Sequence, residues 1–224
     1  MNSKADFRIE FFGESGLLVI FGERIDSELN RKVHLLAEWL AQKSIAGITD
    51  VIPAYASLLI VFDPLKCTHD LLQTLIEQWA QQGERSFPRT CRLVEVPVIY
   101  GGDFGPDLNF VAGHCGLSVD EVIRIHSQTE YSVFMMGFSP GFPYLGGMNP
   151  AIAAPRLQTP RPKVPAGSVG IAGQQTGIYP SESPGGWRLI GWTPLKLFDP
   201  EGEPPFLLEP GDRVRFCPIE QEKA

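Results

Sequence analysis

Two neighbouring stretches decide the fold of this chain: FMMGFSPGFPYLGG at residues 134–147 and TPRPKVPAGSVGIAGQQTGIYPSESPGGW at residues 159–187. Glycine and proline are dense in both, and in an α-helix they cost about 1 and about 3 kcal/mol per site relative to alanine. Aromatic and β-branched residues are interleaved with them, whereas disordered segments lack such residues. We therefore predict short strands joined by tight, rigid turns, which hold polar side chains in fixed places around a groove.

The composition sets limits on the class of protein. The chain has 224 residues, is 43% hydrophobic and 20% charged, and has a net charge of −7. Such a composition is typical of a globular protein of one large or two ordinary domains, and the acidic balance argues against a nucleic-acid partner. No apolar run approaches the roughly 20 residues of a membrane span, and the first residues lack the layout of a signal peptide.

The four cysteines lie far apart in the sequence and form no C-x-x-C pair. They are Cys67, Cys91, Cys115 and Cys217. In a chain of this length, such spacing favours free thiols that are mostly buried, in a reducing compartment. Together with the missing signal peptide, this predicts a cytoplasmic protein that does not associate with membranes.

The first part of the chain alternates strands and helices. Residues 7–12 and 17–21 predict a hairpin, and residues 51–54 and 58–62 predict a second strand pair. Apolar residues at spacings of three and four predict the inner faces of two helices. These residues are Ile25, Leu29, Val33, Leu36 and Leu40 in one helix, and Leu71, Leu72, Leu75, Ile76 and Trp79 in the other. The expected order is ββαββα, a small α+β sandwich.

The helix starts of this first part carry capping residues. Asp26 or Ser27 can cap the first helix, and Thr68 can cap the second. A polar segment at residues 81–88, with one glycine and one proline, then predicts a domain boundary. We accordingly expect an N-terminal domain at residues 1–86 and a second domain at residues 87–224.

The second domain is expected to begin with a strand at 92–100 and two helices at 107–115 and 119–128. Ser118 and Glu121 have the spacing of a capping box at the start of the second helix. From residue 131 onward only strands and turns are predicted, because Gly-Pro turns recur at the spacing of barrels and sandwiches. The last expected strands are 189–191, 195–198 and 213–217. The fold class is therefore α+β, with an all-β second half.

Several catalytic motifs are excluded by residue order. The run AGSVG at 166–170 resembles a nucleophile elbow, but that motif needs a later histidine and a following helix. All four histidines precede Ser168, so this serine is interpreted as a turn residue in a hairpin. No G-x-G-x-x-G opens a helix and no Gly-Lys pair exists, which excludes the common nucleotide-binding loops. No residues have the paired spacing of a zinc site, and no metal is predicted.

The polar side chains of the Gly/Pro-rich stretch form the best candidate site. The cationic members are Arg156, Arg161 and Lys163, and the neutral members are Gln174, Gln175, Thr176, Tyr179, Ser181 and Ser183. Arginine can hold a carboxylate or phosphate with a bidentate fork, and a glutamine amide can bind an amide or lactam. Their placement between proline and glycine favours a pre-organised site. The alternative is an ordinary exposed surface with turn-forming serine and glutamine.

Two residues near this stretch are candidates for acid or base chemistry. Asp103 lies in the Gly-rich turn GGDFGP, and His126 lies at a helix end. Either side chain could transfer a proton to or from a bound ligand. Each residue type is also common in purely structural roles, and the sequence leaves both possibilities open.

Three long strings in the second domain resemble one known family. They are GFSPGFPYLGG at 137–147, TPRPKVPAGSVGIAGQQTGIYP at 159–180 and SPGGWRLIGWTPLKLFDP at 183–200, and they resemble the KipI / allophanate hydrolase subunit 1 family. The resemblance is dense from Val96 to Pro218, and in about the first 85 residues only the order of elements agrees. It implies a small N-terminal α+β domain followed by a cyclophilin-like β-barrel.

The resemblance also implies a function. It points to a subunit of an ATP-dependent 5-oxoprolinase, a hydrolase that cleaves the cyclic amide 5-oxo-L-proline to L-glutamate and is inactive without its partners. The implied partners are an allophanate hydrolase subunit 2-like protein and a lactam-hydrolase-like protein. ATP is the implied co-substrate, at a place that the sequence does not locate. The alternative is a KipI-like regulator that inhibits a sensor histidine kinase.

Site residues are carried over from the resemblance as a hypothesis. The expected substrate-binding residues are Phe138, Phe142, Arg161, Gln174, Gln175, Thr176, Tyr179, Gly186 and Trp187. Arg161 would hold a carboxylate or phosphate, the glutamines and Tyr179 would orient a lactam, and the phenylalanines would form a wall. The expected catalytic residues are Arg161, Gln175, Asp103 and His126. Asp103 stands where the family usually has glutamate, and Cys115 follows His114 where a second polar residue is usual.

Overall fold

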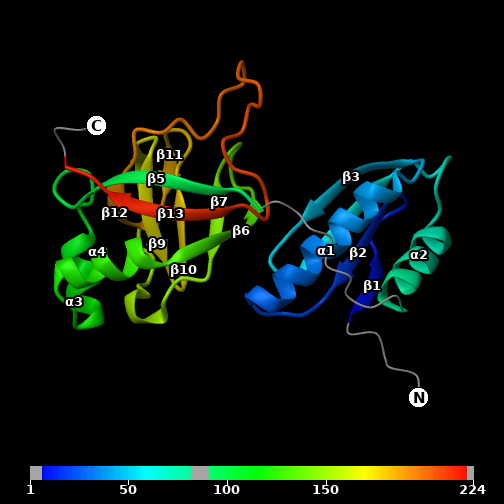
Figure 1. Ribbon diagram of the computed structural model, residues 1–224, viewed down its shortest axis with the longest axis horizontal. Helices are drawn as coiled ribbons and strands as arrows, with labels where there is room; N and C mark the ends of the chain where they lie inside the picture. Colours follow the sequence, from blue (N-terminus) through cyan, green and yellow to red (C-terminus); the bar gives the residue numbers. More distant parts are fainter. Residues whose placement is uncertain (1–6, 82–90, 221–224) are drawn as a thin grey trace. The chain divides into compact units, whose positions relative to one another are not determined.

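The computed structural model describes residues 7–81 and 91–220, and the chain divides into two compact units, 1–90 and 91–224 (Figure 1). Each unit has its own hydrophobic core. The boundary expected between Ser86 and Phe87 lies outside the described residues. In the described ranges no helix is both long enough and apolar enough to cross a membrane.

The first unit has the predicted order ββαββα. Its described residues form a four-stranded antiparallel sheet in the order β1-β2-β4-β3, and two helices pack on one face. The bounds are β1 Arg8–Phe11, β2 Gly16–Ile20, α1 Ser27–Lys43, β3 Ile48–Pro53, β4 Ser57–Phe62 and α2 His69–Gln81. Alternate strand residues such as Leu17, Val19 and Ile60 are fully buried against the helices, as period-two alternation requires.

The helix caps of this unit form as the sequence predicts, but two apolar side chains that were expected on the inner helix faces are exposed. The Asp26 carboxylate accepts from the backbone N–H of Glu28 and Leu29, which caps α1. Ile25 precedes this cap and is 52% exposed, so its assignment to the inner face of the helix was wrong. Leu71 is 45% exposed at the first turn of α2, because Leu72, Ile76 and Trp79 already fill the buried stripe.

In the described part of the second unit, seven strands close into a barrel in the order β10-β7-β6-β13-β5-β12-β9, which confirms the predicted fold class. The pairs are antiparallel except β5 with β13, which run parallel. The bounds are β5 Leu93–Tyr100, β6 Glu130–Met136, β7 Pro143–Gly146, β9 Ser168–Ala172, β10 Gln175–Ile178, β12 Arg188–Trp192 and β13 Arg213–Pro218. A separate two-stranded sheet joins β8, Arg161–Val164, to β11, Ser183–Gly185.

Two helices between β5 and β6 lie at one end of the barrel (Figure 1). They are α3, Leu108–Cys115, and α4, Val119–Gln128. The capping box at the start of α4 is present, because Ser118 and Glu121 each bind the other's backbone N–H. Val111 and Val122 enter the barrel core, so these helices close that end with apolar side chains.

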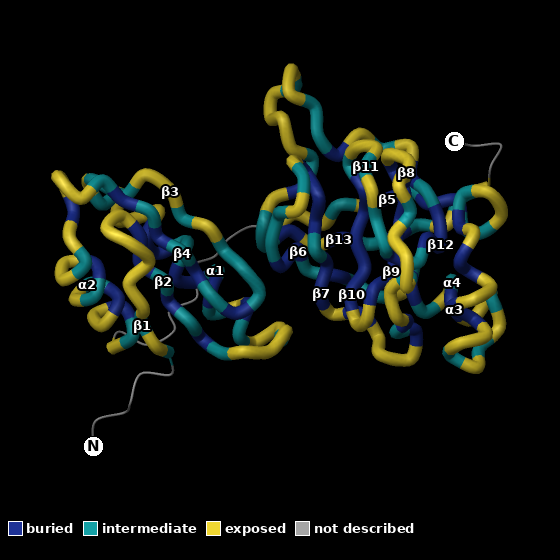
Figure 2. Tube along the Cα trace, turned by 180° about the vertical axis from the view of Figure 1, so that it is seen from behind, coloured by how far each residue is buried: buried dark blue, intermediate teal, exposed yellow. Residues whose placement is uncertain are grey.

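The second unit departs from the sequence predictions in two places. Residues 150–152 form a short 3-10 helix, η1 (Pro150–Ile152), capped by the Asn149 side chain, where only strands and turns were expected. The expected strand at 195–198 is absent, and Phe198 makes only an isolated bridge to Phe206. Pro194 and Pro200 bound this segment, and neither has a backbone N–H with which to extend a strand. The exposed loop that follows projects from the barrel (Figure 2).

All four cysteines belong to the described residues and are free thiols, as expected. Only Cys67 is buried. Cys115 and Cys217 are half-buried and Cys91 is exposed, so the expectation of mostly buried thiols was wrong. Burial raises the pKa of the Cys67, Cys115 and Cys217 thiols, which keeps these side chains in their less reactive neutral form at neutral pH.

Candidate functional site

Strand β10 separates two different environments. Neighbouring residues of a strand point to opposite faces of its sheet. Thr176 points into the barrel, where it contacts His126. Gln175 is therefore on the outer face, opposite Ala172 of β9, which packs with an aromatic layer over these strands.

We call this layer the outer aromatic cluster. Its members are Phe138, Phe142, Tyr144, Tyr179 and Trp187. The Phe142 ring is central, with its centroid 5.2 Å from that of Tyr179, 5.5 Å from that of Trp187 and 4.9 Å from that of Tyr144. Phe138 lies at the rim and is 63% exposed, with a positive φ of 65° that turns the chain outward. The cluster is thus a layer of three buried rings and the half-buried Tyr144, with the exposed Phe138 ring at its edge.

Glycines make room for these rings, which explains their density in the deciding stretch. A Cβ atom at Gly177 would lie 2.8 Å from the Pro143 carbonyl oxygen and 3.1 Å from the Trp187 ring. A Cβ atom at Gly185 would lie 2.4 Å from the Tyr179 hydroxyl. The rings therefore approach the backbone at distances that only glycine permits.

Three buried polar side-chain atoms of the second unit have no hydrogen-bond partner among the described residues. Gln175 is 8% exposed, and its Nε2 has no hydrogen-bond partner among the described residues. The Oγ atoms of Ser139 and Ser183 are buried in the same condition. A buried donor or acceptor without a partner costs about 1–3 kcal/mol, so each such group requires an explanation. Gln175 is the one carried by a strand of the barrel.

A buried carboxylate organises the two arginines next to the cluster. Asp107 is 6% exposed and accepts from the Leu189 backbone N–H at 2.7 Å. Arg161 Nη2 lies 3.0 Å from both carboxylate oxygens, and Arg188 Nη1 lies 3.7 Å from one of them. Arg161 also donates to the Trp187 carbonyl oxygen at 3.5 Å. Two guanidinium groups and one carboxylate leave this group with one net positive charge.

Inside the barrel, His126 belongs to a chain of hydrogen bonds in which the donor of each bond can be assigned. The Thr176 hydroxyl donates to the Gly170 carbonyl at 2.9 Å, so it must accept from His126 Nε2–H, also at 2.9 Å. His126 Nδ1 is then the acceptor for the Tyr100 hydroxyl at 2.7 Å. The imidazole stacks on Phe216 with centroids 4.4 Å apart. Burial lowers the pKa of His126 to about 3, so the ring is neutral in the folded protein.

The structure brings together some predicted site residues and separates others. Phe138, Phe142, Gln175, Tyr179 and Trp187 share the outer face, and Arg161 reaches Trp187.

Four other predicted site residues lie elsewhere. His126 and Thr176 lie in the barrel interior. Asp103 is exposed in the turn after β5, and Gln174 is exposed at the β9–β10 hairpin beside Gly173, whose φ is +59°.

Two residues of this region were missed from the sequence, Asp107 and Arg188. Asp107 was taken only as the first residue of a helix. Its side chain makes no cap bond with α3 and turns to Leu189 and Arg161 instead. No short-range pattern carries this signal, because its partners lie 54 and 82 residues further along the chain.

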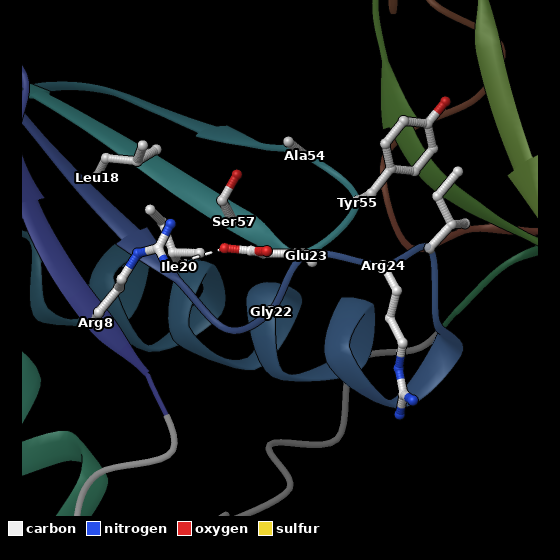
Figure 3. A pocket seen from close by; sticks show the side chains of 11 residues that line it. Arg8, Leu18, Ile20, Gly22, Glu23, Arg24, Ala54, Tyr55 and Ser57 are labelled. Carbon is white, nitrogen blue, oxygen red and sulfur yellow. Dashed lines mark hydrogen bonds and ion pairs between the residues drawn. The ribbon is translucent and has the colours of Figure 1, made fainter.

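A pocket of about 350 Å³ lies in the first unit (Figure 3). Leu18, Ile20 and Ala56 give it apolar walls, with Arg8 and Glu23 at its polar side. These two charged side chains pair with each other at 3.0 Å, as the dashed line in Figure 3 marks. No residue of the predicted site lines it.

The chain combines a ββαββα unit with a closed seven-stranded barrel whose outer face carries an aromatic cluster. The chain belongs to the family described as the carboxyltransferase domain, subdomain C and D, which matches residues 7–208. This agrees with the resemblance found in the sequence.

Two curated relatives and one solved structure illustrate the likeness. The chain is 45% identical to the B subunit of 5-oxoprolinase from Bacillus subtilis, over 96% of this chain and 94% of the relative. It is 42% identical to the B subunit of 5-oxoprolinase from Escherichia coli O157:H7, over 94% and 95%. The crystal structure of TTHA0988 matches with a TM-score of 0.80 and 43% identity, over 92% of this chain and 40% of that chain.

Proposed function

We propose that this protein is a subunit of an ATP-dependent 5-oxoprolinase, a hydrolase that opens the cyclic amide of 5-oxo-L-proline to give L-glutamate. The observation that carries the proposal is the pair of relatives named as the B subunit of 5-oxoprolinase. They are 45% and 42% identical to this chain, and each match spans at least 94% of it.

The outer aromatic cluster is suited to a small planar amide. Aromatic faces bind flat ligands with little loss of conformational entropy, since their rings are already packed. Gln175 offers an amide group whose Nε2 has no partner in the described part of the chain, and a lactam is its natural complement. The positive charge shared by Arg161, Arg188 and Asp107 favours an anionic ligand or intermediate nearby.

The chemistry requires activation because a lactam is a poor electrophile. In the proposed reaction the γ-phosphoryl group of ATP passes to the lactam oxygen, and water adds to the activated carbon. The ring C–N bond then breaks to leave an acyl phosphate, which a second water hydrolyses to L-glutamate and inorganic phosphate, with ADP as the other product. The share of this chain is to hold and orient the ring, while Tyr179 and Trp187 exclude water.

The full activity is assigned to an assembly in the cytoplasm. We propose an allophanate hydrolase subunit 2-like protein and a lactam-hydrolase-like protein as partners, with ATP as co-substrate. Asp103 and His126 receive no direct contact with substrate in this proposal. Asp103 is exposed in a turn, and His126 is fully buried behind β10.

The test is ATP-dependent formation of glutamate from 5-oxo-L-proline. The chain is assayed alone and with the two proposed partners added singly and together. Activity is expected only with the complete set, and it should disappear when this chain is omitted. If folded and associated proteins release no glutamate in any mixture, the proposal is wrong. Binding to a sensor histidine kinase would then be the next measurement.

A further inference from the structure

Arg156 is a cationic side chain of the second unit that lies against the outer aromatic cluster. Its Cζ atom lies 5.9 Å from the centroid of the Trp187 ring. Burial raises the pKa of the Tyr144 and Tyr179 hydroxyls, and the charge of Arg156 acts in the opposite direction on both. The guanidinium group therefore lies close to three rings of the outer aromatic cluster.

Backbone hydrogen bonds hold the chain on both sides of Arg156. Ala154 exchanges two hydrogen bonds with Gly173, at 3.3 and 2.8 Å, which ties the chain to the β9–β10 hairpin. The Leu157 N–H donates to the Gly186 carbonyl at 2.8 Å, beside Trp187. Arg156 lies between these two anchors, so its position over the cluster is set by the fold even though its side chain is exposed.

The two neighbouring arginines pair with a carboxylate, whereas Arg156 has no anionic partner among the described residues. Arg161 pairs with Asp107, and Arg188 is shared between Asp107, the Pro155 carbonyl and the face of Phe110. In the ranges that the structure describes, Arg156 makes no ion pair. A cation held over aromatic rings without an anionic partner is well placed to receive the anionic group of a ligand.

A second observation points to a ligand at the same place. Gln175 lies on the outer face of β10, one residue from Gln174 and two from Gly173, to which the segment before Arg156 is tied. Its Nε2 is enclosed without a partner in the described part of the chain. The hydrogen bonds around Arg156 thus place a positive charge on the side of β10 that carries the buried amide and the layer of rings.

We propose that Arg156 anchors the carboxylate of a small cyclic amide whose ring lies against Trp187 and Tyr179 and whose amide pairs with Gln175. This assignment rests on the proposed 5-oxoprolinase function and moves carboxylate recognition from Arg161 to Arg156. Arg161 keeps the role of fixing Asp107 and the Trp187 backbone.

The test compares KM for 5-oxo-L-proline in the assembled enzyme carrying wild-type chain, Arg156→Ala, Arg156→Lys or Arg124→Ala. Loss of a charged hydrogen bond predicts a KM increase of roughly ten- to a hundredfold for R156A. Arg156→Lys should recover part of this loss, because it keeps the charge and loses the fork. Arg124 is an exposed arginine on α4, and R124A should leave KM unchanged.

A competitor without the carboxylate separates charge recognition from pocket shape. 2-Pyrrolidinone has the lactam ring of 5-oxoproline and no carboxylate, so its inhibition constant should be the same with wild-type chain and with R156A. An unchanged KM for 5-oxoproline in R156A would overturn the inference. So would a rise of KM and of the pyrrolidinone constant by the same factor. An inactive wild-type assembly would instead refute the proposed function, and the inference with it.

Discussion

Buried polar groups on the two faces of β10 differ in whether they have hydrogen-bond partners. On the inner face the side-chain atoms of His126 and Thr176 all find partners, from the Tyr100 hydroxyl to the Gly170 carbonyl. On the outer face, one residue away, Gln175 Nε2 is equally enclosed and has no partner in the described residues. Both groups are buried, so burial alone does not explain the difference.

The difference indicates which polar groups serve the fold and which serve a ligand. A closed hydrogen-bond chain in a core contributes to a unique packing. An unpartnered amide lowers stability, so it requires an explanation, such as a ligand or a water that completes its hydrogen bonds. By this reasoning we expect a structural role for the inner histidine, although histidine is the commonest catalytic base, and we propose a functional role for the outer glutamine.

The largest effect on stability is expected from His126→Ala, which removes the centre of the inner hydrogen-bond chain. This change removes a ring that stacks on Phe216 and leaves the Tyr100 and Thr176 hydroxyls without their partner. The free energy of unfolding should fall by roughly 3–5 kcal/mol. Urea denaturation followed by circular dichroism measures it. A loss below about 1 kcal/mol would contradict the structural role.

A smaller effect is expected when the inner histidine is titrated. The pKa of His126 is about 3 in the folded state and 6.5 in the unfolded state, so below pH 6.5 the unfolded state binds more protons. Stability is therefore fully present above pH 6.5 and decreases as the pH falls toward 3. This group should account for a loss of about 2 kcal/mol between pH 7 and pH 5.

The control for this titration is His126→Gln, which keeps polar atoms and does not titrate. Its free energy of unfolding should lack that part of the pH dependence. Unfolding of both proteins is measured at the two pH values. Equal pH dependence in wild type and variant would show that His126 is not buried in its neutral form.

The smallest effect on stability is expected on the outer face, with Gln175→Leu. The variant replaces an unpartnered amide by an apolar group of similar size, so the free energy of unfolding should change by less than about 0.5 kcal/mol or increase. The glutamate-forming activity of the assembly should nevertheless fall at least about tenfold. A clear loss of stability would place Gln175 with the inner group and remove the distinction between the two faces.

Local features of the fold were predictable from sequence. The order ββαββα, the Asp26 cap and the Ser118–Glu121 capping box depend on residues within a few positions of one another, and each was confirmed. Phe138, Phe142, Tyr179 and Trp187 were grouped from the sequence for a similar reason, and their rings do contact one another. They all lie in two Gly/Pro-rich segments whose composition already favours rigid turns.

Features that depend on barrel closure were not predictable. His126 was interpreted as a candidate base because it stands at a helix end. It follows Val122 by four residues, a spacing that places both on the buried stripe of α4, so a signal for burial was present. Asp107 offered no such signal, since its partners Arg161 and Leu189 reach it only when β8 and β12 are in place.

The parallel pairing of β5 with β13 has a consequence for how the protein is made. Arg213 aligns with Leu93 and Pro218 with Val98. The first barrel strand, β5, can therefore pair with β13 only after about 120 further residues have been translated. The described elements of the first unit end with α2 at Gln81, so they can fold while the ribosome is still elongating. The barrel can close only after residues 213–218 have left the exit tunnel. Until then β5 exposes an unpaired edge, and a stalled or truncated nascent chain would present that edge to chaperones and proteases.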